Sequence, residues 1–170
     1  ARDAFAAAAR ARPDSMAAHD MVLGLDISLD DKVSAEVHAR DVLYRNREAP
    51  LANYVMGSLF IGKGSYSQAE MYLRKAADAP RPNVLAMNDL AEVLRRSGKF
   101  EEAERYARLA TKKAPEFYLV WETLGVILID AGKDLEEAEK CVRQAIEIQK
   151  KSGVEKEDIR VWTSLARAQI

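Results

Sequence analysis

The stretch WETLGVILIDAGKDLEEAEKCVRQAIE (121–147) decides the fold of this chain. On both sides of Gly132, apolar residues recur at steps of three and four, which places them on one face of an α-helix. Gly132 permits the left-handed backbone that ends the first helix. Small residues at Gly125 and Ala138 allow the two helices to approach closely. The stretch therefore predicts a helix–turn–helix hairpin.

This hairpin is one copy of an internal repeat. The alanine of its second helix recurs every 34 residues, with one interval of 35, at Ala1, Ala35, Ala69, Ala103 and Ala138. The turn glycine recurs in the same phase at Gly64, Gly98 and Gly132. A period of this length is typical of stacked hairpin units, none of which buries its apolar face alone.

The residues in these slots resemble the tetratricopeptide repeat family, whose pattern is W-x2-L-G-x2-Y, then A-x3-F, then P, on about 34 residues. Trp121, Leu124, Gly125 and Leu128 give the first motif, and the phased alanines give the second. The resemblance covers essentially the whole chain. It implies an all-α solenoid, a right-handed superhelix of stacked helix–turn–helix hairpins with about ten helices.

The period places the helices and repeats. We expect helices at about 1–12, 15–29, 33–46, 50–62, 66–79, 84–97, 100–113, 117–131, 135–151 and 157–170. The chain is then a single array in which 16–49, 50–83, 84–117 and 118–152 are complete repeats, 1–15 is helix B of a partial repeat and 159–170 is helix A of another. Ends that fall inside repeats predict a fragment of a longer protein, or ends that associate with another chain.

Local signals refine the helix ends. Ser65 with Gln68, and Asp134 with Glu137, are spaced as capping boxes that begin second helices. The link after 135–151 is longer than the other links, so we expect this helix to be longer than its equivalents.

Composition limits the classes of function. The chain has 26 basic and 27 acidic residues, a balance that disfavours nucleic acid as a partner. Cys141 is the only cysteine, which excludes an internal disulfide and is compatible with the cytoplasm. The uncharged runs are too short to span a membrane. We find no nucleophile, base, metal or cofactor constellation and predict no enzyme; His19 stands in the tryptophan slot and is expected to pack.

The resemblance implies that the concave face lined by the first helices binds an extended or helical peptide. Transferred by phase, this face would comprise Asp20, Leu51, Tyr54, Ser58, Ile61, Asn88, Glu92, Arg95, Arg96, Glu122, Val126, Ile129 and Asp130. The same transfer places Gly24, Ile27, Ser28, Gly62, Leu85 and Leu119 on this face, and Thr163 and Arg167 would extend the line.

The arginine pair and the tyrosine of this face can each be interpreted in two ways. Arg95 and Arg96 could bind a carboxylate of a ligand, or could both pair with Glu92 across one helical turn. Tyr54 could form an anchor pocket with Leu51 and Ile61, or simply cover neighbouring helices.

Some relatives bind chaperone tails through a lysine and asparagine clamp. This chain has Asp20 and Gly24 where the first clamp residues would be needed, so chaperone-tail binding is not predicted. We expect a scaffold that binds a peptide or a partner segment of unknown identity. The alternatives are a structural element that self-associates through its ends, and a docking or regulatory domain of a larger protein.

Overall fold

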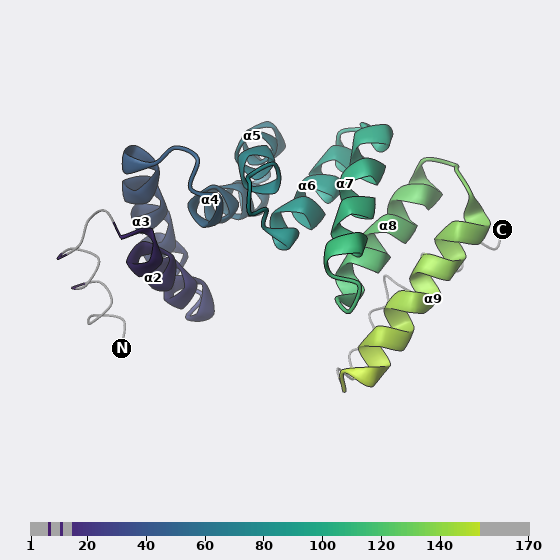
Figure 1. The fold of residues 1–170 in the computed structure, drawn as a ribbon. Coiled ribbons are helices and arrows are strands. Elements are labelled where there is room, and N and C mark those ends of the chain that lie inside the picture. Colours follow the sequence, from purple (N-terminus) through teal and green to yellow (C-terminus); the bar gives the residue numbers. More distant parts are fainter. Residues whose placement is uncertain (1–6, 8–10, 12–14, 154–170) are drawn as a thin grey trace. The chain divides into compact units, whose positions relative to one another are not determined.

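The computed structural model describes residue 7, residue 11 and residues 15–153. Its helices (Figure 1) are α2 Met16–Ser28, α3 Lys32–Arg45, α4 Pro50–Gly62, α5 Tyr66–Ala77, α6 Val84–Arg96, α7 Phe100–Lys113, α8 Tyr118–Asp130 and α9 Leu135–Lys151. These are eight helices, and the described residues contain no strand. Each bound lies within two residues of the predicted one. The remaining two of the ten expected helices, 1–12 and 157–170, fall almost wholly outside the described residues, as do Thr163 and Arg167.

The repeated glycines end the first helix of three hairpins in a left-handed residue, as predicted. Gly64, Gly98 and Gly132 have φ of 71°, 72° and 62°. In each case the amide of the following residue donates to the carbonyl of the fourth residue before the glycine, at 2.9–3.0 Å. In the hairpin of α2 and α3, Asp30 occupies this position with φ of 51°. The glycine repeat does not predict this left-handed residue, because the first hairpin has an aspartate where the other hairpins have glycine.

Small residues bring the helices of two hairpins into close contact, as predicted. A Cβ added at Gly57 would lie 2.6 Å from Cδ2 of Leu73. One added at Gly125 would lie 2.8 Å from Cγ2 of Val142 and 3.2 Å from the carbonyl oxygen of Ala138. Neither position can therefore gain a side chain unless a buried side chain of the opposite helix, Leu73 or Val142, moves.

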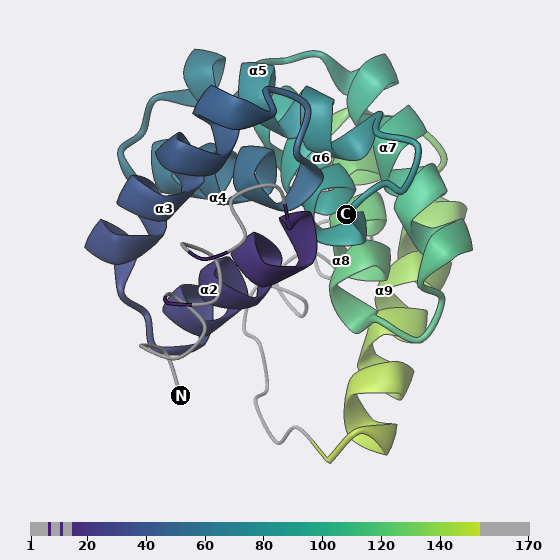
Figure 2. The same ribbon diagram turned by 60° about the vertical axis from the view of Figure 1, so that its left-hand side comes forward.

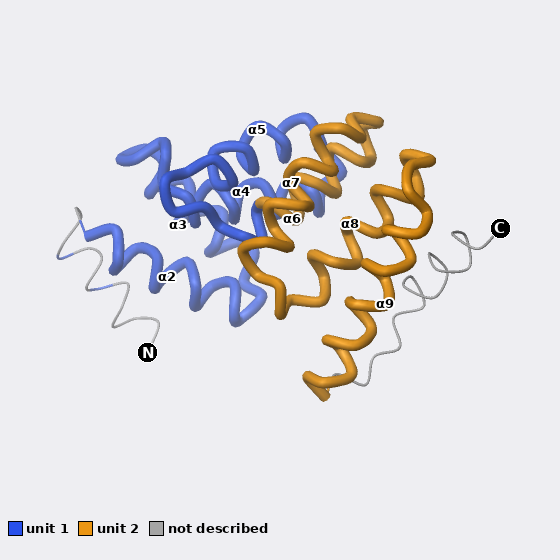
Figure 3. Tube along the Cα trace, turned by 45° about the vertical axis from the view of Figure 1, so that its right-hand side comes forward, with its two compact units in different colours: residues 1–86 blue, residues 87–170 orange. Residues whose placement is uncertain are grey.

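The chain forms two compact units, residues 1–86 and 87–170 (Figure 3), which are described separately. In the first unit, α2 to α5 surround a core that includes Leu23, Ala39, Val42, Ala52 and Met56. Figure 2 shows α2 and α3 beside each other on this unit. In the second unit, consecutive helices from α7 to α9 pack together. Its buried residues include Val120, Leu124, Ile127, Ala138 and Val142.

The two predicted capping boxes have different outcomes. The Asp134 side chain accepts a hydrogen bond from the Glu137 amide at 2.9 Å and begins α9, as expected. Ser65 lies at the N-cap of α5 but its side chain makes no cap hydrogen bond, so that prediction is wrong. Lys99 precedes α7 with nearly the same φ and ψ, which indicates that the backbone of the glycine turn sets this position without help from the side chain.

Helix α9 has 17 residues against 12 to 14 in each of α2 to α8, which confirms its expected extension. Among the described residues, no helix is both long and apolar enough to cross a membrane.

Candidate functional site

A pocket of about 620 Å³ lies in the first unit, between the end of α2, the start of α3 and the second half of α4. Its size is within the roughly 300–1,000 Å³ usual for ligand sites. The lining residues are Asp26, Ile27, Asp30, Asp31, Lys32, Val33, Ala35, Glu36, Tyr54, Val55, Ser58, Leu59, Ile61, Gly62 and Lys63. It therefore combines an apolar surface with charged residues from the α2–α3 turn.

The first hairpin is packed differently from the hairpins that have glycine where their helices cross. Leu23 stands 34 residues before Gly57, in the slot where Gly125 stands in the second unit. Its side chain is fully buried. A large side chain at the crossing point keeps two helices apart, because a packed core cannot absorb its volume otherwise. Accordingly, α2 and α3 pack less extensively than α4 with α5, or α8 with α9.

The wall of the pocket also contains a buried carboxylate. Asp26 is fully buried and occupies the slot of Phe60 and Leu128 in other hairpins. Its Oδ2 lies 2.5 Å from Nδ1 of His38, on α3. A buried charge without a partner is costly, so the imidazole supports the carboxylate in this position. The first hairpin thus has a polar pair where the other hairpins have apolar residues.

Five residues of the predicted face gather at this pocket, and two of them are Ile27 from α2 and Gly62 from α4. Tyr54, Ser58 and Ile61 all line it from α4. Ser58 is exposed, whereas Tyr54 and Ile61 are half-buried. Leu51 does not line the pocket and packs instead against the core of the first unit. Asp20, on α2, is half-buried, and burial raises the pKa of its carboxyl.

In the second unit, the charged residues of the predicted face pair with one another. Arg95 donates through Nε and Nη2 to Glu92 at 2.7 and 2.8 Å, and Arg96 donates through Nε to the same carboxylate at 2.7 Å. Arg95 also donates through Nη1 to Asp130, on α8. The pairing interpretation is therefore the one observed, and the contribution of Asp130 was not predicted.

The ionic state of this cluster follows from the same contacts. Burial alone would raise the pKa of Glu92, but the hydrogen bonds from Arg95 and Arg96 outweigh it and lower that pKa. The bond to Glu92, with that to Asp130, raises the pKa of Arg95 further above its ordinary value. Glu92 and Arg95 are thus both charged at neutral pH and compensate each other. A ligand carboxylate would have to displace Glu92 to reach Arg95.

The remaining residues of the predicted face differ in how far they are exposed to solvent. Asn88, Val126 and Ile129 are half-buried. Glu122 is only 6% exposed. Its assignment to a binding surface is wrong, because a side chain this deeply buried offers almost no area to a partner.

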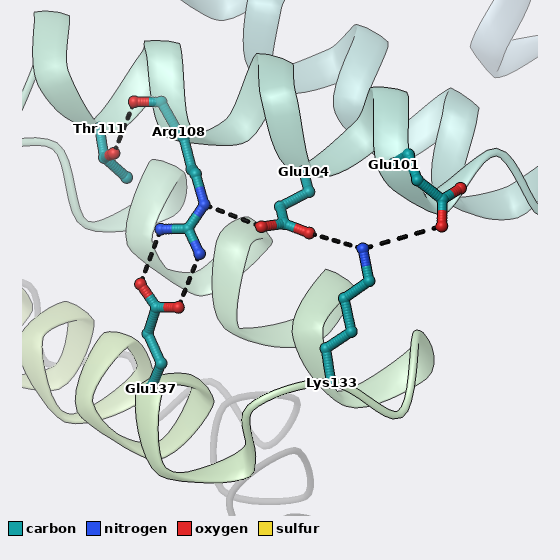
Figure 4. A network of polar contacts seen from close by, with 6 residues as sticks. All are labelled: Glu101, Glu104, Arg108, Thr111, Lys133 and Glu137. Carbon is teal, nitrogen blue, oxygen red and sulfur yellow. Dashed lines mark hydrogen bonds and ion pairs between the residues drawn. The ribbon is translucent and has the colours of Figure 1, made fainter.

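Sequence reasoning missed a second charged network in the same unit (Figure 4). Arg108, on α7, donates to Glu104 at 2.9 Å and reaches Glu137, on α9, through two bonds of 2.7 and 2.6 Å. Lys133 lies 3.0 Å from Glu104 and 3.7 Å from Glu101. The Arg108–Glu104 spacing of four residues was readable from the sequence. The link to Glu137 needs the stacking of hairpins, so it was not.

The described residues show no group of three or more histidines, cysteines or carboxylates placed to bind a metal. Cys141 is buried, which raises the pKa of its thiol to about 11. It is therefore uncharged at neutral pH and a poor nucleophile. His19 is likewise buried, as expected for a packing residue.

Structural comparison finds the same fold in several solved proteins. YrrB, a tetratricopeptide repeat protein with an unusual peptide-binding site, has a TM-score of 0.73 at 19% identity over 99% of this chain and 92% of its own. The Sgt2 domain from Aspergillus fumigatus has a TM-score of 0.60 at 23% identity over 69% of this chain and 74% of its own. The pilF protein of Pseudomonas aeruginosa has a TM-score of 0.71 at 18% identity over 93% of this chain and 69% of its own.

No curated protein sequence is significantly similar to this chain. The family model for the tetratricopeptide repeat matches residues 54–116 and 88–152, which together span more than half of the chain. With the phased alanines, the glycine turns and the hairpin packing, this match shows that the chain belongs to the tetratricopeptide repeat family.

Proposed function

We propose that this chain binds a segment of a partner protein on the first unit, at the pocket beside α4. Proteins of its family are protein-interaction scaffolds, which sets the general class. The observation that carries the proposal is the gathering of Tyr54, Ser58 and Ile61 around one pocket. The family resemblance and the repeat phase place the same three residues on the predicted concave face.

The comparison with YrrB supports a peptide-type ligand, since that protein has a peptide-binding site on a similar fold. The second unit is a weaker candidate because Glu92, Arg95 and Asp130 already satisfy each other. A preformed pocket lowers the ordering cost on the scaffold side, so a few anchor contacts can supply the affinity.

The test is affinity capture of partners with the full chain and with two tyrosine variants. Tyr54→Ala removes a pocket wall, whereas Tyr44→Ala changes a tyrosine of the same unit that is 90% exposed and does not line the pocket. We expect Tyr54→Ala to reduce capture at least tenfold and Tyr44→Ala to leave it unchanged. Equal capture by all three proteins, with unchanged circular dichroism spectra, would remove this surface from consideration.

A further inference from the structure

The surface of the pocket in the first unit is apolar where α4 forms it. Val55 is buried at 3% exposure, and Tyr54, Leu59 and Ile61 are half-buried around it. Ile27, from the end of α2, extends this surface towards solvent. Large aliphatic side chains that remain accessible inside a concavity favour an apolar anchor from a ligand.

Val33 extends the apolar surface from the other side, at the start of α3. It is 77% exposed, although it also lines the pocket. Soluble proteins expose scattered apolar residues, but Ile27 and Val33 flank the same cavity. Apolar side chains therefore stand at the opening of the pocket as well as in its interior.

The charged residues of the pocket indicate that the ligand carries a positive charge in addition to an apolar side chain. Four carboxylates line it, from Asp26, Asp30, Asp31 and Glu36, against two lysines, Lys32 and Lys63. Acidic residues therefore outnumber basic ones in the lining, although Asp26 is buried and contacts His38. A cationic segment is attracted to such a surface and an anionic one is repelled.

The four carboxylates differ in how far they are already engaged. Asp31 caps α3 by accepting from the Ser34 amide at 3.0 Å. Glu36 accepts from Arg40 at 2.7 Å and from Lys63 at 2.9 Å. Asp30 has only a loose contact, 3.6 Å from Lys32, and its side chain is 83% exposed. Asp30 is therefore the carboxylate best placed to meet a charge on a ligand.

The origin of the pocket makes it a property of this hairpin and not of every repeat. Leu23 replaces the small residue that closes other hairpins, and Asp26 replaces an apolar core residue. Asp30 replaces the turn glycine and adds a carboxylate at the opening. Two of these departures, Asp26 and Asp30, line the cavity itself, and Leu23 stands three residues before Asp26 on the same helix.

We propose that this pocket recognises a large aliphatic or aromatic side chain that is flanked by lysine or arginine in an extended segment of a partner protein. The apolar side chain enters between Val55, Leu59 and Ile61, and the cation lies near Asp30. This specificity rests on the proposed function of the same pocket.

The test is selection of short random peptides on the full chain, followed by fluorescence anisotropy of the enriched peptides. We expect enriched peptides to share a large apolar residue within two positions of lysine or arginine. Ser58→Phe should fill the pocket and weaken their binding at least tenfold. Ser67→Phe is the matched control, since Ser67 is exposed on α5 and does not line the pocket.

The charge is tested separately by Asp30→Asn, because asparagine tolerates the left-handed conformation of this position. Binding should weaken about twofold to fivefold, the range for one exposed ion pair. Asp78→Asn, an exposed carboxylate of the same unit outside the pocket, should have no effect.

Several results would overturn the inference. They are enrichment of acidic or wholly polar peptides, no enrichment at all, or equal binding by Ser58→Phe and Ser67→Phe. Light scattering that shows dimers dissolved by Ser58→Phe would also overturn it, since the occupant would then be a second copy of the chain. If partner capture still depends on Tyr54 in any of these cases, the proposed function stands and only the specificity falls.

Discussion

Replacing Gly125 by alanine tests whether close helix contact sets the geometry of the second unit. The change adds one methyl group where α8 crosses α9. Its Cβ would lie 2.8 Å from Cγ2 of Val142 and 3.2 Å from the carbonyl oxygen of Ala138. Val142 is β-branched and fully buried, so it has few other rotamers available. The Ala138 carbonyl belongs to the backbone of α9 and moves only with that helix.

The expected magnitude is the sum of two opposing effects. Alanine is favoured over glycine in a helix by about 0.8–1 kcal/mol. Overpacking a filled core costs about 1–3 kcal/mol. We therefore expect Gly125→Ala to destabilise the second unit by about 0–2 kcal/mol. Gly24→Ala is the matched control, because an added Cβ there has no atom within 4 Å. It should stabilise the chain by about 0.8–1 kcal/mol.

Urea unfolding followed by circular dichroism at 222 nm measures both variants. The two free energies of unfolding should differ by about 1–3 kcal/mol, with Gly24→Ala the more stable. Val142→Ala in the Gly125→Ala background removes the clashing methyl and should recover part of the loss as a coupling energy. If Gly125→Ala stabilises the chain as much as Gly24→Ala, close contact at this crossing does not limit the hairpin.

Three further predictions concern single charged side chains. Asp30→Gly should stabilise the chain by about 0.5–1 kcal/mol in urea unfolding, because glycine adopts φ of 51° without strain. Arg108→Ala should lower the free energy of unfolding by about 0.2–1 kcal/mol at pH 7 and flatten its fall in acid. The depressed pKa values of Glu104 and Glu137 in the folded state make their stabilisation complete above about pH 4.5, and it is lost as pH falls through the folded values. Burial raises the pKa of Asp89 to about 6, so its charge opposes folding above that pH and the folded state gains stability as pH falls from 6 towards 4. Asp89→Asn should therefore stabilise the chain by about 1–3 kcal/mol at pH 7 and have little effect near pH 4, as measured by denaturation at both values.

The sequence contained enough information for the helices, because periodicity and turn glycines act locally. The predicted ends of eight helices agree with the structure to within two residues. Gly125 lies at a close contact between two helices, as predicted. The glycine repeat does not identify Asp30 as a turn residue, although Asp30 stands 34 residues before Gly64. An aspartate can also adopt the left-handed conformation, and its presence in the glycine position does not signal this conformation from sequence alone.

The candidate site was less predictable, because it depends on how far helices stand apart. The position in the repeat places Tyr54, Ser58 and Ile61 on the predicted face, but it does not predict the pocket that they line. Asp26 and Asp30, which also line the pocket, are informative only by their positions in the repeat. Phase also placed Glu122 on the surface, whereas the structure buries it. A helix face that looks exposed in one repeat can be covered when the hairpins stack.

The most direct test of the account is a titration of isotope-labelled full chain with a peptide selected on it, followed by amide chemical shifts in nuclear magnetic resonance spectra. We predict that the shifts concentrate in residues 26–36 and 54–63, around the pocket, and that α9 is unaffected. Shifts centred on Glu92, Arg95 and Asp130 instead, with the pocket silent, would contradict the account and place recognition on the second unit.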